Sequence, residues 1–360
     1  MPSPAAPTAA PTAEAPGIAC RIHGAHDLRL APEPLDRPPE LGPHQVQLRL
    51  GAGGICGSDL HYWQHGRVGA FVIRDPLVPG HEASGIVERV GGAVTRVAPG
   101  QRVAIDPSHA CGQCDYCREG RRHLCRRMRF LGSASVHPHV QGMFRERFVI
   151  GESQLTPVEE DVSLGEIACA EPLSIGLHAV HRAGPLLGKT VLVTGGGTIG
   201  CMAVLAARLA GAARILVCDI ADRPLDVARG IGADRTVRSD LAAPEDLADI
   251  ADIAVEAAGS PGALATCLQA TRRGGRIVQV GTLPAEGLHF PANSIMAREL
   301  DYVGAFRANA EFGWAVDAIR SRRVDVRPLI SAQLPLARAD EAFALAADRS
   351  RSTKVQLVCA

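Results

Sequence analysis

The sequence of 360 residues has few aromatic side chains and no surplus of charge of either sign. Aromatic residues make up only 4 %, so a core must be built from Ala, Val, Leu and Ile. Lys plus Arg and Asp plus Glu number 38 each, which argues against a nucleic-acid-binding surface spread over the chain. No segment has the roughly 18 uninterrupted apolar residues of a membrane helix, so we expect no membrane partner. At about 150 residues per domain, the length predicts two or three domains.

The first 17 residues, MPSPAAPTAAPTAEAPG, lack the features of a targeting segment. They contain no Lys or Arg, and proline interrupts every apolar stretch, which also disfavours a helix. We therefore predict a disordered tail over residues 1–17, without a catalytic role, and a cytoplasmic protein. The eleven cysteines fit a reducing compartment only as free thiols or as metal ligands.

Four of the cysteines stand in one short segment, CGQCDYCREGRRHLC. Their spacing, C-x2-C-x2-C-x7-C, satisfies the tetrahedral preference of zinc with every coordination position filled by protein. Such a closed site has no room for a substrate, so it predicts a structural zinc lobe at about residues 108–128. An iron–sulfur cluster and a group of free thiols are the rival interpretations. The predicted ligands are Cys111, Cys114, Cys117 and Cys125.

A second set of metal-binding side chains is spread over three other segments. Cys56 lies in GGICGSDLHYW, His81 and Glu82 lie in VPGHEASG, and Glu171 lies in ACAEPLS. Taken singly, such residues are more often core filling or ordinary surface. Together they offer sulfur, nitrogen and oxygen donors, the mixed and incomplete set of a catalytic zinc with an open coordination position.

A glycine pattern marks the second half of the chain. The β-branched run TVLVT at residues 190–194 predicts a buried strand, and it leads through GGGTIG into a helix-like stretch at residues 201–210. Glycines at this turn allow a pyrophosphate to approach the start of the helix. Further strand-like runs at residues 213–220, 251–256 and 276–280 alternate with helical stretches, which indicates a parallel sheet that binds a dinucleotide.

The expected coenzyme is NAD, with NADP as the alternative. Asp219 lies at the end of the second strand, where a carboxylate binds the ribose hydroxyls and repels a 2′-phosphate. Arg223 is close enough in sequence to reach such a phosphate, although a solvated arginine at the start of a helix is the more ordinary interpretation. The predicted coenzyme-binding residues are Gly195, Gly197, Thr198, Ile199, Gly200, Asp219, Arg223, Val280 and Arg307.

These three features, in this order, resemble the zinc-dependent medium-chain dehydrogenases from about Ile18 to the C-terminus. The segments PLVPGHE, CGQCDYC and AEPLS resemble the polyol dehydrogenase branch, and HGRVGAF, MRFLGSAS, FRANAEF and KVQLV resemble the L-idonate 5-dehydrogenases. The resemblance implies an α/β fold with a GroES-like, β-rich catalytic domain at residues 18–169 and 309–360. It further implies a Rossmann domain, a doubly wound parallel sheet, at residues 170–308, and a homotetramer or homodimer.

The resemblance also assigns roles around the catalytic zinc. Cys56 and His81 match zinc ligands, while Glu82 and Glu171 compete for the remaining position, each directly or through water. Ser58 is placed to take up the substrate's hydroxyl proton, and His61 to carry it toward solvent.

The implied reaction is hydride transfer from a secondary alcohol to NAD(P). For a sugar acid, L-idonate would become 5-keto-D-gluconate, and an arginine fork would suit its carboxylate. A sorbitol- or xylitol-type polyol is the alternative substrate, and Ala308 departs from the tyrosine that animal sorbitol dehydrogenases carry at this place. A non-catalytic metal- or nucleotide-binding protein is a distant alternative. The expected substrate contacts are Tyr62, Arg129 and Arg307.

Overall fold

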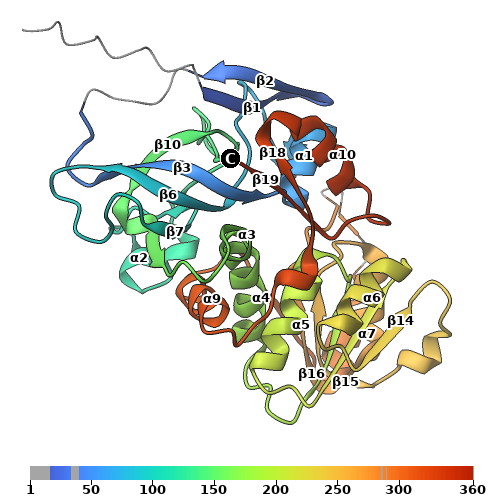
Figure 1. Cartoon of the computed structure of the whole chain (residues 1–360). Coiled ribbons are helices and arrows are strands. Elements are labelled where there is room, and N and C mark those ends of the chain that lie inside the picture. The colour runs from blue at the N-terminus through green and yellow to red at the C-terminus, as the bar shows by residue number, and fades with distance from the viewer. Residues whose placement is uncertain (1–16, 34–39, 285–286, 289, 360) are drawn as a thin grey trace, which may run out of the picture.

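The computed structural model describes residues 17–33, 40–284, 287–288 and 290–359, which form two lobes, each built around a sheet (Figure 1). The predicted tail lies outside the described residues except for Gly17, which begins β1 (Gly17–Gly24). This strand pairs antiparallel with β2 (Asp27–Glu33). Among the described residues, no helix is long and apolar enough to cross a membrane.

The larger sheet has seven strands, in the order β11-β7-β6-β3-β19-β18, with β10 also paired to β3. Its pairs are antiparallel except for the parallel pair of β18 and β19. Val46, Leu48 and Leu50 alternate along β3 and pack into one buried cluster, as the period of a strand requires. The strands are β3 (Gln45–Gly54), β6 (Glu82–Val90), β7 (Arg102–Ile105), β10 (Arg147–Gly151), β11 (Leu155–Val158), β18 (Ile330–Pro335) and β19 (Lys354–Val358).

Short elements extend this lobe. Two small antiparallel two-stranded sheets, β4-β5 and β8-β9, and four helices connect or cover the strands, and α3 lies between the two large sheets (Figure 1). The pieces are α1 (Gly57–His65), β4 (Arg67–Val68), β5 (Phe71–Val72), β8 (Ser108–His109), α2 (Asp115–Arg118), β9 (Arg129–Phe130), α3 (Leu164–Ala168) and α10 (Ala339–Ala347).

The second sheet has six parallel strands in the order β14-β13-β12-β15-β16-β17. This confirms the predicted parallel sheet. The strand order reverses between β12 and β15, and ligands of such sheets bind outside the carboxyl ends of the strands at that point. The strands are β12 (Thr190–Thr194), β13 (Arg214–Asp219), β14 (Arg235–Arg238), β15 (Ala251–Glu256), β16 (Thr271–Gln279) and β17 (Asp301–Gly304).

Helices cover both faces of the second sheet. Val191 and Val193 of β12 pack in the cluster that contains α4, α5 and α9, whereas Leu192 packs on the opposite side with α7. Strand alternation therefore divides this lobe into two apolar layers. The helices are α4 (Ala170–Ala183), α5 (Thr198–Leu209), α6 (Asp222–Gly230), α7 (Pro261–Ala270), α8 (Ala292–Arg298) and α9 (Glu311–Arg320).

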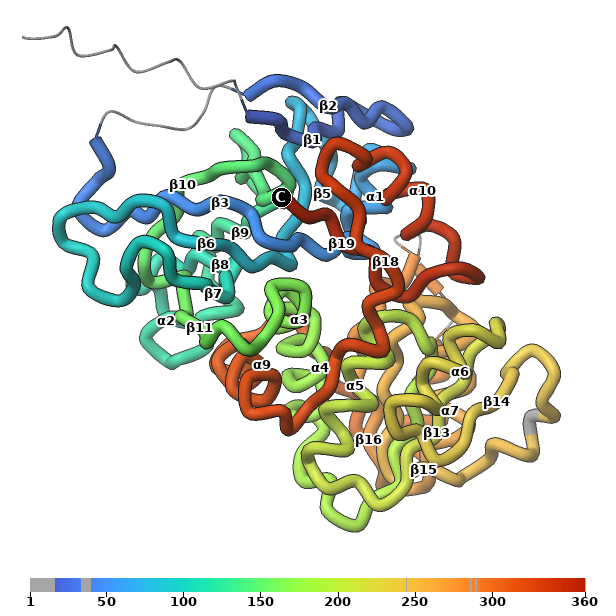
Figure 2. The backbone as a smooth tube through the Cα atoms, in the orientation of Figure 1, coloured from blue at the N-terminus to red at the C-terminus, as the bar shows by residue number. Residues whose placement is uncertain are grey.

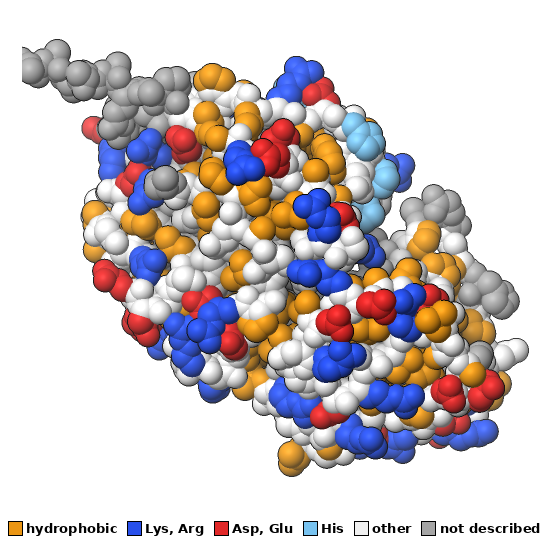
Figure 3. Space-filling model, turned by 45° about the vertical axis from the view of Figure 1, so that its right-hand side comes forward, with side chains coloured by type: hydrophobic (Ala, Val, Ile, Leu, Met, Phe, Trp, Pro, Cys, Tyr) orange, Lys and Arg blue, Asp and Glu red, His pale blue; other side chains and the backbone are white. Residues whose placement is uncertain are grey.

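The C-terminal part of the chain returns to the first lobe. Strand β19 pairs with β3, and the tube in Figure 2 shows this last strand beside the first long one. Acidic and basic side chains are interspersed on the face shown in Figure 3, where a notch separates the lobes. The predicted domain division at residues 169/170 and 308/309 stays a prediction.

Candidate metal centres and coenzyme cleft

Cys56, His81 and Glu82 come together in the first lobe. Their ligand atoms lie within 4.8 Å of one another. Cys56 precedes α1 as its N-terminal capping residue, and Glu82 is the first residue of β6. Residues Gly54 and Glu82 face each other across β3 and β6, and a Cβ on Gly54 would lie 2.2 Å from Glu82 Oε2, so only glycine leaves room for this carboxylate.

Asp59 holds the loops that carry these ligands, and the sequence did not indicate it. The backbone N–H groups of Cys56 and Gly80 donate to its two carboxylate oxygens at 2.9 and 3.0 Å. His81 Nδ1 lies 3.8 Å from Asp59 Oδ1. Burial raises the pKa of Asp59, while His81 and the two backbone donors lower it. The carboxylate therefore fixes the turn before α1 against the turn before β6.

Lys354 is a second residue that the sequence did not indicate. Its Nζ donates to Glu82 Oε2 at 2.6 Å and to the carbonyl of Ile55 at 2.9 Å, and both members of this ion pair are 1 % exposed. Glu82 Oε1 and His81 Nδ1 are buried without a hydrogen-bond partner. Two orphaned buried polar atoms beside a thiol form a donor set that fits a divalent cation such as zinc.

Glu171 lies beside this group without belonging to its compact part. It is the second residue of α4 and is 7 % exposed. Burial raises its pKa to about 8, with His81 lowering the pKa and the charges of Glu82 and Cys56 raising it. Of the two carboxylates predicted as zinc ligands, Glu82 is the one whose oxygen lies within 4.8 Å of the ligand atoms of both Cys56 and His81.

Phe130 connects His81 to Arg307. The ring centroids of His81 and Phe130 are 5.4 Å apart, and Arg307 Cζ lies 4.8 Å from the centroids of both Phe130 and Phe306. Arg307 and Glu171 line one small cavity. Burial lowers the pKa of Arg307, and Glu171 raises it. The guanidinium thus contacts two aromatic rings, one of which also packs on His81 of the metal-binding group.

The roles of the other two predicted substrate contacts, Tyr62 and Arg129, stay predictions. Tyr62 is a buried residue of α1, 3 % exposed, and its hydroxyl accepts a hydrogen bond from Ala134 N at 3.0 Å. Arg129 is exposed at the first position of β9. Its neighbour Phe130, rather than Arg129 itself, packs on His81.

Ser58 and His61 share one face of α1. They are three residues apart on this helix, so their side chains lie on the same side. The Ser58 side chain hydrogen-bonds the Cys56 sulfur, and His61 is exposed. Partial burial, followed by the charges of His65 and Arg349, lowers the pKa of His61. Its imidazole is therefore available as a neutral proton acceptor near pH 7.

The four predicted lobe cysteines also converge. Their sulfurs lie within 4.8 Å of one another, with Cys114 Sγ 3.5 Å from Cys117 Sγ. Backbone N–H groups of Cys111 and Arg127 donate to Cys125 Sγ at 3.2 and 3.3 Å. Backbone hydrogen bonds also lower the pKa of Cys111 to about 6. Donors aimed at sulfur favour thiolates, so these residues fit a fully coordinated zinc.

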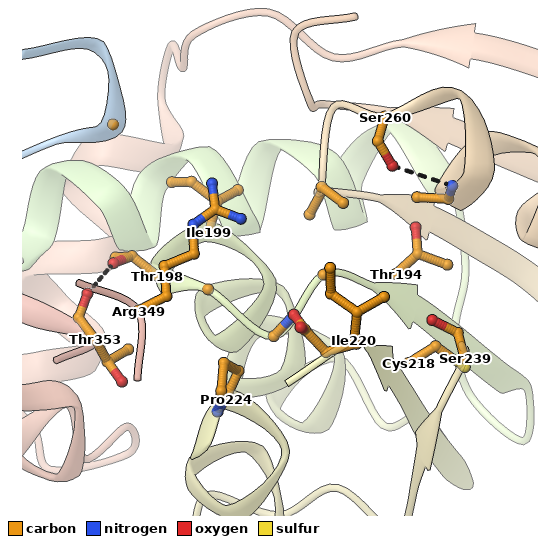
Figure 4. A pocket seen from close by; sticks show the side chains of 18 of the residues that line it. Thr194, Thr198, Ile199, Cys218, Ile220, Pro224, Ser239, Ser260, Arg349 and Thr353 are labelled. Carbon is orange, nitrogen blue, oxygen red and sulfur yellow. Dashed lines mark hydrogen bonds between the residues drawn. The ribbon is translucent and has the colours of Figure 1, made fainter. Parts of the chain in front are cut away.

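A cavity of about 490 Å³ lies at the carboxyl ends of β12, β13 and β15. Five predicted coenzyme-binding residues line it, and Figure 4 shows Thr198 and Ile199 at one side and Ile220 at the other. Gly200, Arg223, Val280 and Arg307 lie outside its lining. The lining residues from the prediction are Gly195, Gly197, Thr198, Ile199 and Asp219.

Two of the glycines in this turn are required because a larger side chain would clash. Gly195 has φ +89° and its Cβ would lie 2.8 Å from Ala258 N, while a Cβ on Gly200 would lie 1.7 Å from the carbonyl oxygen of Gly195. Gly200 therefore serves the packing of α5 on β12 rather than the cavity. Asp219 fixes the same turn, because its carboxylate accepts from Gly196 N at 2.7 Å and Ala221 N at 3.0 Å.

A third group of metal-ligand type, His178, His181 and Glu311, joins α4 to α9. One oxygen, Glu311 Oε1, accepts from His178 Nδ1 at 3.1 Å and from His181 Nδ1 at 2.6 Å. Its other oxygen accepts from Asn309 N at 2.8 Å. These residues satisfy one another by hydrogen bonds, so we interpret them as a link between the helices.

Both halves of the chain match models of known protein families. The family model described as "Alcohol dehydrogenase GroES-like domain" matches residues 42–160, and the one described as "Zinc-binding dehydrogenase" matches residues 198–321. The chain is 38 % identical over 350 residues to a sorbitol dehydrogenase of Gallus gallus, across 95 % of this chain and 96 % of that protein.

The second relative is an L-idonate 5-dehydrogenase (NAD(P)(+)) of Escherichia coli. The chain is 39 % identical to it over 314 residues, which cover 86 % of this chain and 91 % of that protein. The crystal structure of L-idonate 5-dehydrogenase from Escherichia coli K-12 superposes with a TM-score of 0.90 at 36 % identity, covering 95 % of this chain and 98 % of that one. The similarity therefore extends over both lobes.

Proposed function

The chain belongs to the zinc-dependent medium-chain dehydrogenases, and from this premise we propose that it oxidises L-idonate at C5 to 5-keto-D-gluconate. As a member of this family it is an NAD(P)-dependent oxidoreductase of the polyol and sugar-acid class. The choice of a sugar acid rests on one observation above all. Arg307 is a half-buried guanidinium beside the metal-binding group, and no hydrogen bond or ion pair joins it to another described residue.

Cys56, His81 and a carboxylate would hold the catalytic zinc. Glu82 is the carboxylate within reach of both, and its Oε1 has no other partner. Glu171 is the second candidate, acting directly or through water. When bound, zinc would make the substrate hydroxyl far more acidic, and loss of that proton would favour hydride transfer from the carbon that bears the oxygen to the nicotinamide. Lys354 keeps Glu82 in place by donating to its carboxylate, and Asp59 holds the turn before His81 by accepting from the backbone N–H of Gly80.

Ser58 and His61 would carry the hydroxyl proton away. The Ser58 hydroxyl accepts the substrate proton and gives its own onward, and the His61 ring takes it to solvent. The exposure of His61 and its lowered pKa support this role, because a neutral imidazole at the surface accepts and releases protons near pH 7.

Arg307 would bind the carboxylate of the sugar acid. A guanidinium stacked on Phe130 and Phe306 keeps its N–H edge free for a two-pronged contact with a carboxylate. In L-idonate, the carboxylate carbon lies four bonds from C5, so the acid group can meet Arg307 while C5 faces the metal-binding group. The hydroxyl of an uncharged polyol can accept a hydrogen bond from this arginine but cannot form the two-pronged ion pair.

The coenzyme cavity supports NAD over NADP. Asp219 lines it, and a second phosphate on the adenosine ribose would meet this carboxylate, whereas the nearby Asp240 is already paired with Arg238. Nicotinamide supplies the hydride acceptor, while the chain supplies alignment with the substrate carbon.

Substrate kinetics test the proposal. Purified, zinc-loaded protein is assayed for NADH formation with L-idonate, sorbitol and xylitol, and we expect the highest kcat/KM with L-idonate. In Arg307→Met, kcat/KM for L-idonate should fall by at least about tenfold, because a charge-assisted contact contributes about 1.5–3 kcal/mol. The same variant should change kcat/KM for sorbitol by less than about threefold.

Arg96→Met is the matched control, because Arg96 is an exposed arginine outside the site and its replacement should leave kcat/KM for both substrates unaffected. A native preference for sorbitol or xylitol would overturn the sugar-acid assignment. It would favour the polyol alternative that the sorbitol dehydrogenase relative suggests.

A further inference from the structure

Arg307 has a backbone conformation that is uncommon for a residue other than glycine. Its φ angle is +57°, in the left-handed region, where the Cβ atom crowds the following carbonyl oxygen. Such a conformation persists only where the surrounding structure fixes it, and it is often found at binding sites. Arg307 lies in the connecting segment, residues 305–310, between β17 and α9. The contacts that hold this segment therefore determine where the guanidinium lies.

Hydrogen bonds hold the connecting segment on both sides of the arginine. Two residues before it, Ala305 N donates to the carbonyl of Gln279 at 2.9 Å, at the end of β16. Two residues after it, Asn309 N donates to Glu311 Oε2 at 2.8 Å, and Asn309 Nδ2 donates to the carbonyl of Gly120 at 2.7 Å. The first contact belongs to the six-stranded sheet, whereas the contact with Gly120 reaches the other lobe of the molecule.

Gly120 belongs to the four-cysteine loop, residues 108–130, which runs from β8 to β9. Its N–H donates to the carbonyl of Cys117, one of the four predicted zinc ligands, at 3.2 Å. The loop ends at Phe130, whose ring centroid lies 4.8 Å from Cζ of the guanidinium. Figure 1 shows α2, a helix of this loop, beside α9. Asn309 thus ties the connecting segment to the same loop that carries the ring on which the guanidinium packs.

We propose that Asn309 is a positioning residue for the sugar acid, because it holds Arg307 against Phe130 and beside the metal-binding group. Without the amide donor, the connecting segment loses its contact with the four-cysteine loop, and the left-handed conformation of the arginine can relax. The guanidinium is then less often in place to meet a carboxylate, so the acid binds more weakly while hydride transfer from the bound substrate is unaffected. The inference rests on the proposed function, in which Arg307 binds the acid group.

Kinetics with an acid and with an uncharged polyol test the inference. The zinc-loaded protein is assayed at saturating NAD with L-idonate and with sorbitol. Asn309→Ala should raise KM for L-idonate by about three- to tenfold, as expected for the loss of one hydrogen bond, and leave kcat within about twofold. Both constants for sorbitol should stay within about twofold of the native values. Asn309→Gln, which keeps the amide donor on a longer side chain, should give an intermediate KM for L-idonate.

A double variant separates positioning from a general loss of structure. In the Arg307→Met background, Asn309→Ala should change KM for L-idonate by less than about twofold, because the group that Asn309 positions is absent. Asn293→Ala is the matched control, since Asn293 is the other asparagine of the chain and is exposed on α8. It should leave the constants for both substrates unchanged.

Three results would overturn the inference. They are an unchanged KM for L-idonate in Asn309→Ala, an equal loss for L-idonate and sorbitol, and a loss that persists in the Arg307→Met background. An error in the proposed function is recognised separately, because Arg307→Met alone then leaves kcat/KM for L-idonate unchanged, and the inference fails with it. The expected loss in Arg307→Met together with no effect of Asn309→Ala overturns only the role of Asn309.

Discussion

Lys354 and Glu82 form a buried ion pair, in which the distance from Lys354 Nζ to Glu82 Oε2 is 2.6 Å. Taking both charges out of water is costly, and the pair persists because its partners and the carbonyl of Ile55 satisfy the ammonium group. Burial lowers the pKa of Lys354, but Glu82 and Cys56 more than offset this, so its pKa is raised. At neutral pH the residue stays positively charged beside the metal-binding group.

Replacing Lys354 with Met should therefore be strongly destabilising. The variant leaves the Glu82 carboxylate buried without its cation, and breaking a buried pair in this way costs about 3–5 kcal/mol of the free energy of unfolding. Urea denaturation followed by circular dichroism measures the difference.

Lys189→Met is the matched control for that prediction. Lys189 is the other lysine of the chain, half exposed and 3.9 Å from Asp252, so its loss should cost less than about 1 kcal/mol. The double variant Lys354→Met/Glu82→Gln should recover part of the lost stability, because it removes the orphaned charge. Equal stability of the two single lysine variants would contradict the account of this pair.

Helices α4 and α9 are joined by hydrogen bonds between two histidines and one glutamate. Glu311 lies in the first turn of α9, and both of its histidine partners lie on α4. Burial raises the pKa of Glu311, but hydrogen bonds from His178 and His181 and the backbone donor of Asn309 outweigh it, so the pKa is well below its usual range. The folded protein therefore holds this carboxylate ionised where the unfolded chain would protonate it.

This link predicts a specific acid sensitivity. A carboxyl whose folded pKa is depressed contributes stability above its unfolded pKa of about 4.3, and that stability is lost as pH falls toward the folded value. Between about pH 5 and pH 3, the free energy of unfolding of the native protein should fall with pH more steeply than that of Glu311→Gln. Denaturant titrations at several pH values measure both slopes.

Glu160→Gln is the control, because Glu160 is exposed and its side chain makes no hydrogen bond to another described residue. Its slope should match that of the native protein. If the free energy of unfolding depended equally on pH in the native protein and in Glu311→Gln, the ionised Glu311 carboxylate would not stabilise the contact between α4 and α9.

Local patterns predicted most elements around the coenzyme cavity. The expected strands at residues 190–194 and 251–256 coincide with β12 and β15. The helix after the glycines begins at Thr198, earlier than the predicted 201, because its first turn contains Gly200 and packs against β12 without an apolar pattern. Strand β16 begins at Thr271 rather than 276, because its first residues, TRRGG, carry no apolar strand pattern, and its pairing with β15 shifts register between Ala251 and Ile253.

At the scale of the whole molecule, the metal-binding group is assembled from distant segments. The sequence could indicate Cys56, His81 and Glu82 because each lies in a short motif with donor chemistry of its own. It could not indicate Lys354, because the contact of this residue with Glu82 depends on β19 returning to pair with β3 some 300 residues after that strand. The sequence likewise does not decide whether Glu82 or Glu171 is the third zinc ligand. In the fold, the Glu82 carboxylate lies within 4.8 Å of the ligand atoms of Cys56 and His81, and this favours Glu82.

The predicted homotetramer or homodimer concerns the outer surface of the molecule. Strand β17 is an edge of the six-stranded sheet, and an edge strand presents unpaired backbone groups that a second chain can use. This assembly stays a prediction, as does the cytoplasmic location.

The central claim is that an open zinc site at Cys56, His81 and a glutamate carries the reaction, while the four-cysteine site serves the fold. Metal content and turnover of Cys56→Ser test it most directly, with Cys169→Ser, a buried thiol next to α4, as the control. The native protein and the control should hold about two zinc ions per chain and oxidise L-idonate. Cys56→Ser should keep about one zinc ion and bind NADH as before, with no measurable turnover. Turnover at the native rate by a Cys56→Ser protein with one zinc ion would contradict the claim.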